Sequence, residues 1–316
     1  MSVVTLTSAG AAQAAPASPF PYHGRFAPSP TGPLHFGSLI AALGSFLCAR
    51  QANGEWLLRI EDIDPPREVA GSADAILHAL ERHGLEWDGS VLYQSGRSDA
   101  YDAALERLRD DGWLYECSCT RSEIASHGRR GPYGIIYPGT CRTGARSSRR
   151  PRSLRVRTHE HLIHFDDLLQ GLQQQRLQET SGDFIVRRAD GLYAYQLAVV
   201  VDDDEQNITD VVRGADLLDS TPRQIHLQQL LSLRNPRYLH LPIAANSRGE
   251  KLSKQTHAPA LEQRTPSENL WRALTFLDQK PPPDLLHATP RETLTWAIEA
   301  WNVKHVPHRG IIRLED

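Results

Sequence analysis

The chain has 316 residues, 40% of them hydrophobic and 23% charged, which is ordinary for a folded protein with a large core. No apolar run approaches the length that spans a bilayer, and four cysteines are too few for a disulfide scaffold of this size. Residues 1–20 carry no charged side chain and lack the basic start and firm apolar stretch of a secretory signal. We interpret 1–20 as a disordered tail and expect a cytoplasmic protein.

Helices and strands are expected to alternate from residue 21 onward. Four elements are predicted in the first third of the chain: a buried helix over 39–49, a strand over 55–60 and helices over 73–83 and 99–109. Ser72 is placed to cap the helix over 73–83. Because strands alternate with helices, we predict a parallel α/β sheet, with 21–116 as the first half of a Rossmann-type core.

The pattern breaks at Cys117, where we predict a module inserted over 117–182. Its first part, 117–157, is rich in Gly, Ser and Pro and contains ten arginines but a single acid, Glu123. The overall net charge of −3 hides this basic block. Such a block favours a polyanionic partner such as RNA, although a run of charge can also be a solvated loop.

The second half of the core is predicted over 183–260 and a short helical part over 261–316. The elements expected after the break are strands over 154–157, 183–187, 193–201 and 238–244, a helix over 222–233 and a turn over 246–249. Ser267 is placed to cap a helix over 268–277. Thr289 and Glu292 have the spacing of a capping box ahead of an apolar helical stripe.

Two short signatures lie far apart in the chain, at 33–38 (PLHFGS) and 251–255 (KLSKQ). In this order they resemble the HIGH and KMSKS elements of class I aminoacyl-tRNA synthetases, which implies that ATP is used to form an aminoacyl-adenylate. The resemblance implies catalytic roles for His35, Lys251 and Lys254, and contacts to ATP from His35, Gly37, Ser38 and Lys254. The amino end of a helix can stabilise an α-phosphate, and lysines can hold departing phosphates. Mg²⁺ is expected on the phosphates rather than in a protein cage.

Two further motifs, 25–32 (RFAPSPTG) and 59–64 (RIEDID), resemble the glutamyl-tRNA synthetases more closely. The resemblance implies that glutamate is bound by Arg25, Phe26, Ala27, Pro28, Ser29, Glu61, Tyr195 and Arg213. Arg25 offers a guanidinium fork for a carboxylate, and Glu61 offers a partner for an ammonium group. The alternatives are a structural ion pair for the charged residues and a core aromatic at the start of a strand for Tyr195.

The resemblance covers about 21–260 and departs from the family in three ways. Ser38 stands at the second His of HIGH, KLSKQ lacks the Met and the final Ser of KMSKS, and the 56 residues after 260 are too few for the family's anticodon-binding region. This resembles a shorter branch of the family that transfers glutamate to queuosine in the anticodon of tRNA(Asp). The implied partners are ATP, L-glutamate and queuosine-containing tRNA(Asp), and we expect a monomer. The alternatives are a truncated synthetase that charges a tRNA 3′ end and a catalytically silent zinc-containing RNA-binding module.

Three cysteines cluster in the inserted module. Cys117, Cys119 and Cys141 can supply three thiolates of a structural zinc site, which needs a fourth ligand. His127 is the chemically usual choice, whereas the family resemblance points to Tyr137, which we favour. Zinc there would hold together a loop-rich insertion that lacks a core, and free cysteines are the alternative.

Overall fold

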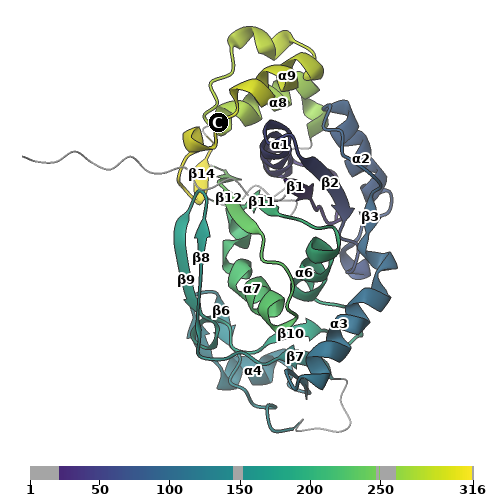
Figure 1. Cartoon of the computed structure of the whole chain (residues 1–316), viewed down its shortest axis with the longest axis vertical. Coiled ribbons are helices and arrows are strands. Elements are labelled where there is room, and N and C mark those ends of the chain that lie inside the picture. Colours follow the sequence, from purple (N-terminus) through teal and green to yellow (C-terminus); the bar gives the residue numbers. More distant parts are fainter. Residues whose placement is uncertain (1–20, 145–151, 247–248, 250–260, 315–316) are drawn as a thin grey trace, which may run out of the picture.

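The computed structural model describes residues 21–144, 152–246, 249 and 261–314 (Figure 1). Its strands are β1 His23–Phe26, β2 Glu55–Ile60, β3 Leu92–Tyr93, β4 Leu114–Cys117, β5 Arg129–Gly131, β6 Gly134–Ile136, β7 Ser153–Val156, β8 Leu162–Asp167, β9 Gly171–Arg176, β10 Phe184–Arg187, β11 Asp210–Gly214, β12 Arg237–Leu241, β13 Ile243–Ala245 and β14 Ile311–Arg313. Its α-helices are α1 Phe36–Gln51, α2 Ser72–Arg82, α3 Ser98–Asp110, α4 Arg121–His127, α5 Leu177–Thr180, α6 Tyr195–Glu205, α7 Thr221–Leu230, α8 Pro266–Phe276 and α9 Pro290–Ala300. The 3₁₀ helices are η1 Pro65–Arg67, η2 Gln94–Gly96, η3 Ala215–Ser220, η5 Leu261–Gln263, η6 Pro283–His287 and η7 Val303–His305. The predicted tail 1–20 lies outside these residues, and none of the described helices is both long and apolar enough to cross a membrane.

Parallel strands form the centre of the molecule, as predicted. Strand β2 pairs in parallel with β1 and β3, and β12 pairs in parallel with β11 and β8. Strands β1 and β11 lie side by side, where the His23 N–H donates to the Thr209 hydroxyl at 2.9 Å and the Thr209 N–H donates to the His23 carbonyl at 3.0 Å. The order of the strands therefore runs in opposite directions from the contact between β1 and β11. Such a switch point opens a crevice at the carboxyl ends of the strands.

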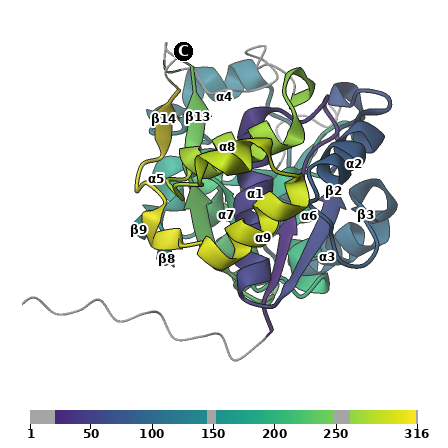
Figure 2. The same cartoon turned by 90° about the horizontal axis from the view of Figure 1, so that it is seen from above.

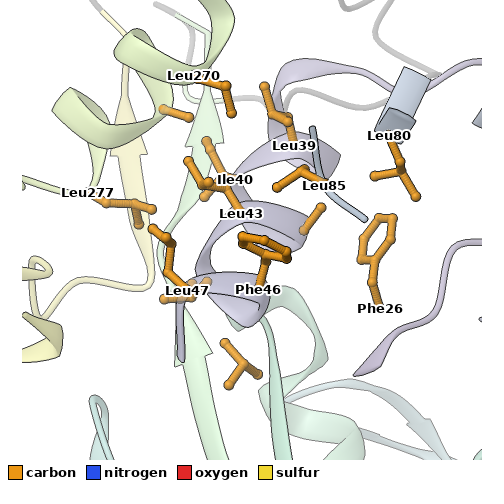
Figure 3. Close-up of a cluster of buried hydrophobic side chains, with 14 of the residues drawn as sticks. Phe26, Leu39, Ile40, Leu43, Phe46, Leu47, Leu80, Leu85, Leu270 and Leu277 are labelled. Carbon is orange, nitrogen blue, oxygen red and sulfur yellow. The ribbon is translucent and has the colours of Figure 1, made fainter. Parts of the chain in front are cut away.

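Helix α1 is buried nearly all round, because the sheet covers one side and the C-terminal helices cover the other. Leu39, Leu43 and Leu47 are fully buried, and Figure 2 shows α8 and α9 lying over α1. In Figure 3 the leucines of α1 face Leu270 and Leu277. Gly44 allows close approach to β12, since a Cβ there would lie 2.4 Å from a methyl carbon of Leu241.

Antiparallel strands form a separate layer at the end of the molecule opposite α8 and α9 (Figure 1). Strand β7 pairs with both β4 and β10, and β5 and β6 form a hairpin. These pairings cross the predicted module boundaries of 117 and 183. Strand β10 belongs with the antiparallel sheet, whereas β8 and β9 join the parallel strand β12. Composition does not reveal these memberships, because they depend on backbone hydrogen bonds between distant segments.

One predicted strand is wrong, and another is interrupted. Residues 193–201 were expected to be extended, but 195–205 form helix α6. A short apolar run suits a buried helix as well as a strand, and periodicity alone does not separate them. The strand predicted over 238–244 is split at Pro242, which lacks the N–H that a sheet ladder needs, into β12 and β13.

Two predicted helix caps are also misplaced. Helix α2 is preceded by Gly71 at φ 74°, and Ser72 is its first residue. The Ser72 hydroxyl instead donates to the Gly32 carbonyl at 2.7 Å and accepts from the Gly32 N–H at 2.8 Å, which ties α2 to the loop of the first signature. Helix α8 is capped by Thr265 rather than by the buried Ser267. The capping box of Thr289 and Glu292 is confirmed.

Candidate active site

One cavity of about 950 Å³ lies at the carboxyl ends of β1, β2, β11 and β12. It is lined by all eleven described residues that were predicted to contact glutamate or ATP: Arg25, Phe26, Ala27, Pro28, Ser29, His35, Gly37, Ser38, Glu61, Tyr195 and Arg213. We call it the main cavity. Lys251 and Lys254, which were predicted to be catalytic together with His35, lie outside the described residues.

The first signature forms the amino end of α1. His35 is the N-cap residue, and its Nδ1 accepts the Ser38 N–H at 3.3 Å. The Ser38 hydroxyl lies 3.1 Å from the other ring nitrogen of His35. The amino end of a helix carries unpaired N–H groups and a partial positive charge, so this part of the main cavity suits an anionic ligand.

Arg25 is held by a carboxylate that sequence reasoning missed. Its Nε and Nη2 donate to Asp203 at 3.0 and 3.3 Å, and Arg59 donates to the same carboxylate at 2.6 Å. All three side chains are buried, and Arg25 is only 3% exposed. Among the described residues no hydrogen bond reaches Nη1 of Arg25. One edge of the predicted guanidinium fork is therefore engaged by Asp203, and Nη1 is the nitrogen that can meet a ligand carboxylate.

Glu61 is a buried carboxyl beside two guanidinium groups. Its backbone N–H donates to the Pro28 carbonyl at 3.0 Å, which aligns the two glutamate motifs, and its carboxylate lies 3.9 Å from Nε of Arg59. Burial raises the pKa of Glu61 to about 7, even though Arg59 and Arg25 lower it. A ligand ammonium group would favour the ionised form, so Glu61 is suited to bind a cation near neutral pH.

Arg213 is fixed by a set of buried polar partners. Its Nη2 donates to Thr221 and Gln224, each at 2.8 Å, and its Nη1 donates to the Tyr195 hydroxyl at 3.3 Å. Its Nε donates to Nε2 of His240 at 3.0 Å. This network leaves the Arg213 guanidinium and the Tyr195 hydroxyl together on the cavity wall.

His240 takes part in this network as a neutral ring. Its other nitrogen, Nδ1, lies 2.6 Å from the Asp167 carboxylate. Burial lowers the pKa of His240 to about 4, so Nδ1–H donates to Asp167 while Nε2 accepts from Arg213. The sequence signal for this role of His240 was a polar histidine within the largely apolar strand β12.

The three clustered cysteines lie close together in the inserted module. Their sulfur atoms are all within 4.8 Å of one another, and those of Cys119 and Cys141 are 3.5 Å apart. The Tyr137 hydroxyl lies 3.3 Å from the Cys117 sulfur and 3.9 Å from the Cys119 sulfur. A tetrahedral zinc ion with bonds of about 2.3 Å places its sulfur ligands about 3.8 Å apart, so these residues fit such a site.

His127 is placed differently from these four residues. It ends helix α4, where its exposed ring contacts the Glu123 carbonyl at 2.8 Å and the Ser126 hydroxyl at 2.9 Å. The ring of Tyr137, in contrast, is fixed beneath the Arg155 guanidinium, 3.9 Å from the ring centre. The geometry therefore favours Tyr137 over His127 as a fourth ligand.

Comparison with known proteins identifies the family. The catalytic-domain model of class I tRNA synthetases (E and Q) matches residues 22–269. The chain is 54% identical over 289 residues to the glutamyl-Q tRNA(Asp) synthetase of Aromatoleum aromaticum, covering 92% of this chain and 91% of that protein. It is also 54% identical over 296 residues to the protein of the same name from Dechloromonas aromatica, covering 93% and 98%. The chain belongs to the glutamyl-Q tRNA(Asp) synthetase family.

A solved structure shares the fold of this glutamyl-Q tRNA(Asp) synthetase family member. The glutamate-tRNA synthetase of Elizabethkingia anophelis superposes with a TM-score of 0.78 at 24% identity, over 94% of this chain and 68% of that chain. Family membership confirms the predicted class I synthetase resemblance and shows that the chain is a ligase-type enzyme. The alternative of a catalytically silent RNA-binding module is thereby excluded.

Proposed function

We propose that this enzyme uses ATP to convert L-glutamate into glutamyl-adenylate in the main cavity and then transfers glutamate to queuosine in the anticodon of tRNA(Asp). The observation that carries the proposal is the gathering of all eleven described glutamate and ATP candidates around one cavity. The names of the full-length relatives support the acceptor. We also expect the enzyme to be monomeric and cytoplasmic.

In the activation step, a carboxylate oxygen of glutamate attacks the α-phosphate of ATP, and pyrophosphate leaves. Such a transfer needs positioning and compensation of charge on the phosphate oxygens. We assign the α-phosphate to His35 and the amino end of α1, and the departing phosphates to Lys251 and Lys254 with Mg²⁺. Glu61 binds the ammonium group of glutamate, and Arg25, Arg213 and Tyr195 bind its carboxylates.

We further propose that Cys117, Cys119, Tyr137 and Cys141 hold a zinc ion. Four protein ligands make a closed site, so the metal would stabilise structure rather than activate water. Cys117 ends β4, whereas Tyr137 and Cys141 follow the β5–β6 hairpin, so a bound ion would link these two parts of the module. In this role zinc would keep the inserted module folded and ready to bind RNA phosphates.

The proposal is tested with labelled glutamate. Glutamate-dependent exchange of pyrophosphate into ATP should proceed without tRNA, and label should pass to tRNA(Asp) only when it contains queuosine. A Lys254→Ala variant should lower exchange by orders of magnitude, because phosphate charge is no longer compensated. Labelling that is equal with and without queuosine, or that is lost when the 3′-terminal nucleoside is removed, would instead establish 3′-end charging.

A further inference from the structure

Another cavity, of about 330 Å³, lies between the β5–β6 hairpin of the inserted module and the η3–α7 segment of the core. We call it the hairpin cavity, and its walls include Tyr133, Arg155, Phe184, Gln196, Asp219 and Arg223. Such a volume is at the lower end for small-molecule sites and suits a nucleobase better than a nucleoside triphosphate. None of its lining residues was singled out for ATP or glutamate.

The hairpin cavity and the main cavity share a dividing wall. Tyr195 lines the main cavity and its neighbour Gln196 lines the hairpin cavity. In the same way, Leu217 of η3 faces the main cavity and Asp219 faces the hairpin cavity. A group bound in the hairpin cavity would therefore lie directly across α6 and η3 from the proposed site of glutamyl-adenylate.

The rim of the hairpin cavity has the composition of an RNA contact. Tyr133 and Ile135 are 52% and 39% exposed, which is unusual for large apolar side chains, and Arg129 and Arg130 are on the same hairpin. Proteins that bind unpaired RNA bases stack them on exposed aromatic rings beside basic residues. The hairpin thus offers a stacking surface next to an open cavity.

The interior of the hairpin cavity offers both an acceptor and donors of hydrogen bonds. The Asp219 carboxyl, the Tyr133 hydroxyl and the Arg223 guanidinium line the same cavity and act on one another electrostatically. Burial raises the pKa of Asp219, while Tyr133 and Arg223 lower it. Arg155 is 6% exposed, and its Nε has no hydrogen-bond partner among the described residues.

These groups complement one edge of a guanine-type base. Guanine and 7-deazaguanine present two adjacent N–H donors beside a carbonyl acceptor. A carboxylate can accept from both donors, and a guanidinium can donate to the carbonyl. Adenine and the pyrimidines do not present that pair of donors. The base of queuosine is a 7-deazaguanine that carries its cyclopentenediol on an aminomethyl group at position 7.

We propose that the hairpin cavity binds the 7-deazaguanine base of the acceptor nucleoside, with Asp219 accepting its N–H groups and Tyr133 stacking on its face. This inference rests on the proposed function. The substituent at position 7 would then extend beside Gln196, around the wall formed by α6 and η3, toward the glutamyl group in the main cavity. There a hydroxyl oxygen of the diol forms an ester bond with the glutamyl carbonyl carbon, the anhydride bond to AMP breaks, and the hydroxyl proton passes to solvent.

A consequence concerns tRNA(Asp) that carries guanine in place of queuine. Its base presents the same donors and acceptor but lacks the diol, so it should occupy the hairpin cavity without accepting glutamate. We expect it to inhibit transfer competitively against queuosine-containing tRNA(Asp). Specificity for queuosine would then arise at the reacting hydroxyl rather than at the base edge.

The test compares Asp219→Asn with Asp110→Asn, which removes an exposed carboxylate at the end of α3. Binding of free queuosine nucleoside is followed by calorimetry, and transfer to queuosine-containing tRNA(Asp) is followed with labelled glutamate. Asp219→Asn should weaken nucleoside binding and lower transfer kcat/KM by roughly 10- to 100-fold, the range for loss of a bidentate base contact. Exchange of pyrophosphate should fall far less than transfer, and Asp110→Asn should resemble the wild type.

A pair of variants separates stacking from a structural role of the hairpin. Tyr133→Phe keeps the ring and should retain most of the transfer activity, whereas Tyr133→Ala should lose about tenfold, as expected for a stacked base. Equal nucleoside binding by the wild type and Asp219→Asn, or no binding by the wild type, would overturn the inference. A wild type that binds the nucleoside but transfers no glutamate to queuosine-containing tRNA(Asp) would refute the proposed function and leave the cavity assignment supported.

Discussion

Arginines and other polar side chains are prominent both around the main cavity and in the inserted module, but the two regions are stabilised differently. Around the main cavity, Arg25, Arg59 and Arg213 are buried against polar partners and lie on two large apolar clusters. Among the described residues of the module, the buried cluster around the cysteines consists of Cys117, Tyr137 and Cys141, whereas apolar residues of β8 and α5 pack in the core. The apolar clusters of the core can fix the first arrangement, whereas we expect the arrangement around the cysteines to depend on the proposed zinc ion.

The largest expected effect is at Asp203. Asp203→Asn would remove the carboxylate to which both Arg25 and Arg59 donate, and removing one partner of a buried ion pair costs about 3–5 kcal/mol. Although burial raises the pKa of Asp203, the two arginines bring it below its usual range, so the residue is ionised at neutral pH. We expect pyrophosphate exchange to fall by about a hundredfold or more, since Arg25 loses its orientation.

Asp204→Asn is the matched control, because Asp204 is the next residue and its carboxylate accepts only from the backbone N–H of Arg234 among the described contacts. Denaturant unfolding and exchange should both change little in this variant. An Asp203→Asn enzyme that keeps wild-type exchange would show that the buried arginine network does not position glutamate.

The next largest effect is expected when the metal is removed from the inserted module. Cys141→Ser, or treatment with a chelator, should release zinc and loosen the part of the inserted module around the cysteines while the apolar clusters of the core persist. We expect transfer to tRNA to fall by an order of magnitude or more and exchange to be nearly retained. The measurements are metal analysis, limited proteolysis within 117–157 and both activity assays.

Cys48→Ser provides the control for loss of a thiol, because Cys48 packs in the core on α1 and lies outside the three-cysteine cluster. It should keep its zinc and its transfer activity. Purified wild-type protein without zinc, or a Cys141→Ser variant with normal transfer, would contradict the proposed metal site.

Glutamate binding should depend on pH through Glu61. A carboxyl whose pKa is raised by burial is protonated below that pKa and then cannot balance the charge of an ammonium group. The KM for glutamate in the exchange assay should therefore rise as the pH falls below about 7, by about tenfold per unit. kcat should change less, and Glu61→Gln should bind glutamate weakly with little dependence on pH. A flat KM across this range would show that Glu61 is not the ammonium partner.

The smallest expected effects come from two matching capping boxes. Thr120 caps α4 in the module, and Thr289 caps α9 against the core. Replacing either by Ala removes a helix cap, which costs about 1 kcal/mol. Thr289→Ala should lower the free energy of global unfolding by that amount without changing activity. Thr120→Ala should instead loosen the module, which proteolysis would detect, and lower transfer more than exchange.

The parts of the site that could be predicted from sequence were those that lie within a motif. Arg25, His35 and Glu61 lie within short contiguous patterns, so their proximity followed from the family resemblance, and all three line the main cavity. Asp203 and His240 were missed because their roles depend on partners that are distant in the chain. The prediction of a strand over 193–201 hid Asp203 further, because this acid lies within helix α6 and the strand was expected to end before it.

The fold was predictable to a similar degree. Long apolar patterns such as α1 and β2 were confirmed, because burial of a whole helix or strand leaves a clear composition. Strand β10 was assigned to the wrong sheet, since local sequence does not encode which distant strand completes a hydrogen-bond ladder. Placement of Tyr137 beside the cysteines agreed with the expected ligand set, and whether zinc binds there stays a prediction.

The position of α1 between the sheet and the C-terminal helices has a consequence for synthesis on the ribosome. Helix α1 emerges early, whereas α8 and α9, which supply Leu270, Leu274 and Leu294 to the same apolar cluster, emerge much later. Until then the face of α1 that carries Leu39 and Leu43 has no cover from these helices, and uncovered apolar surface on a nascent chain promotes aggregation. Translation that stalls before α8 should therefore yield an insoluble product that depends on chaperones, even though every described residue lining the main cavity has already been made.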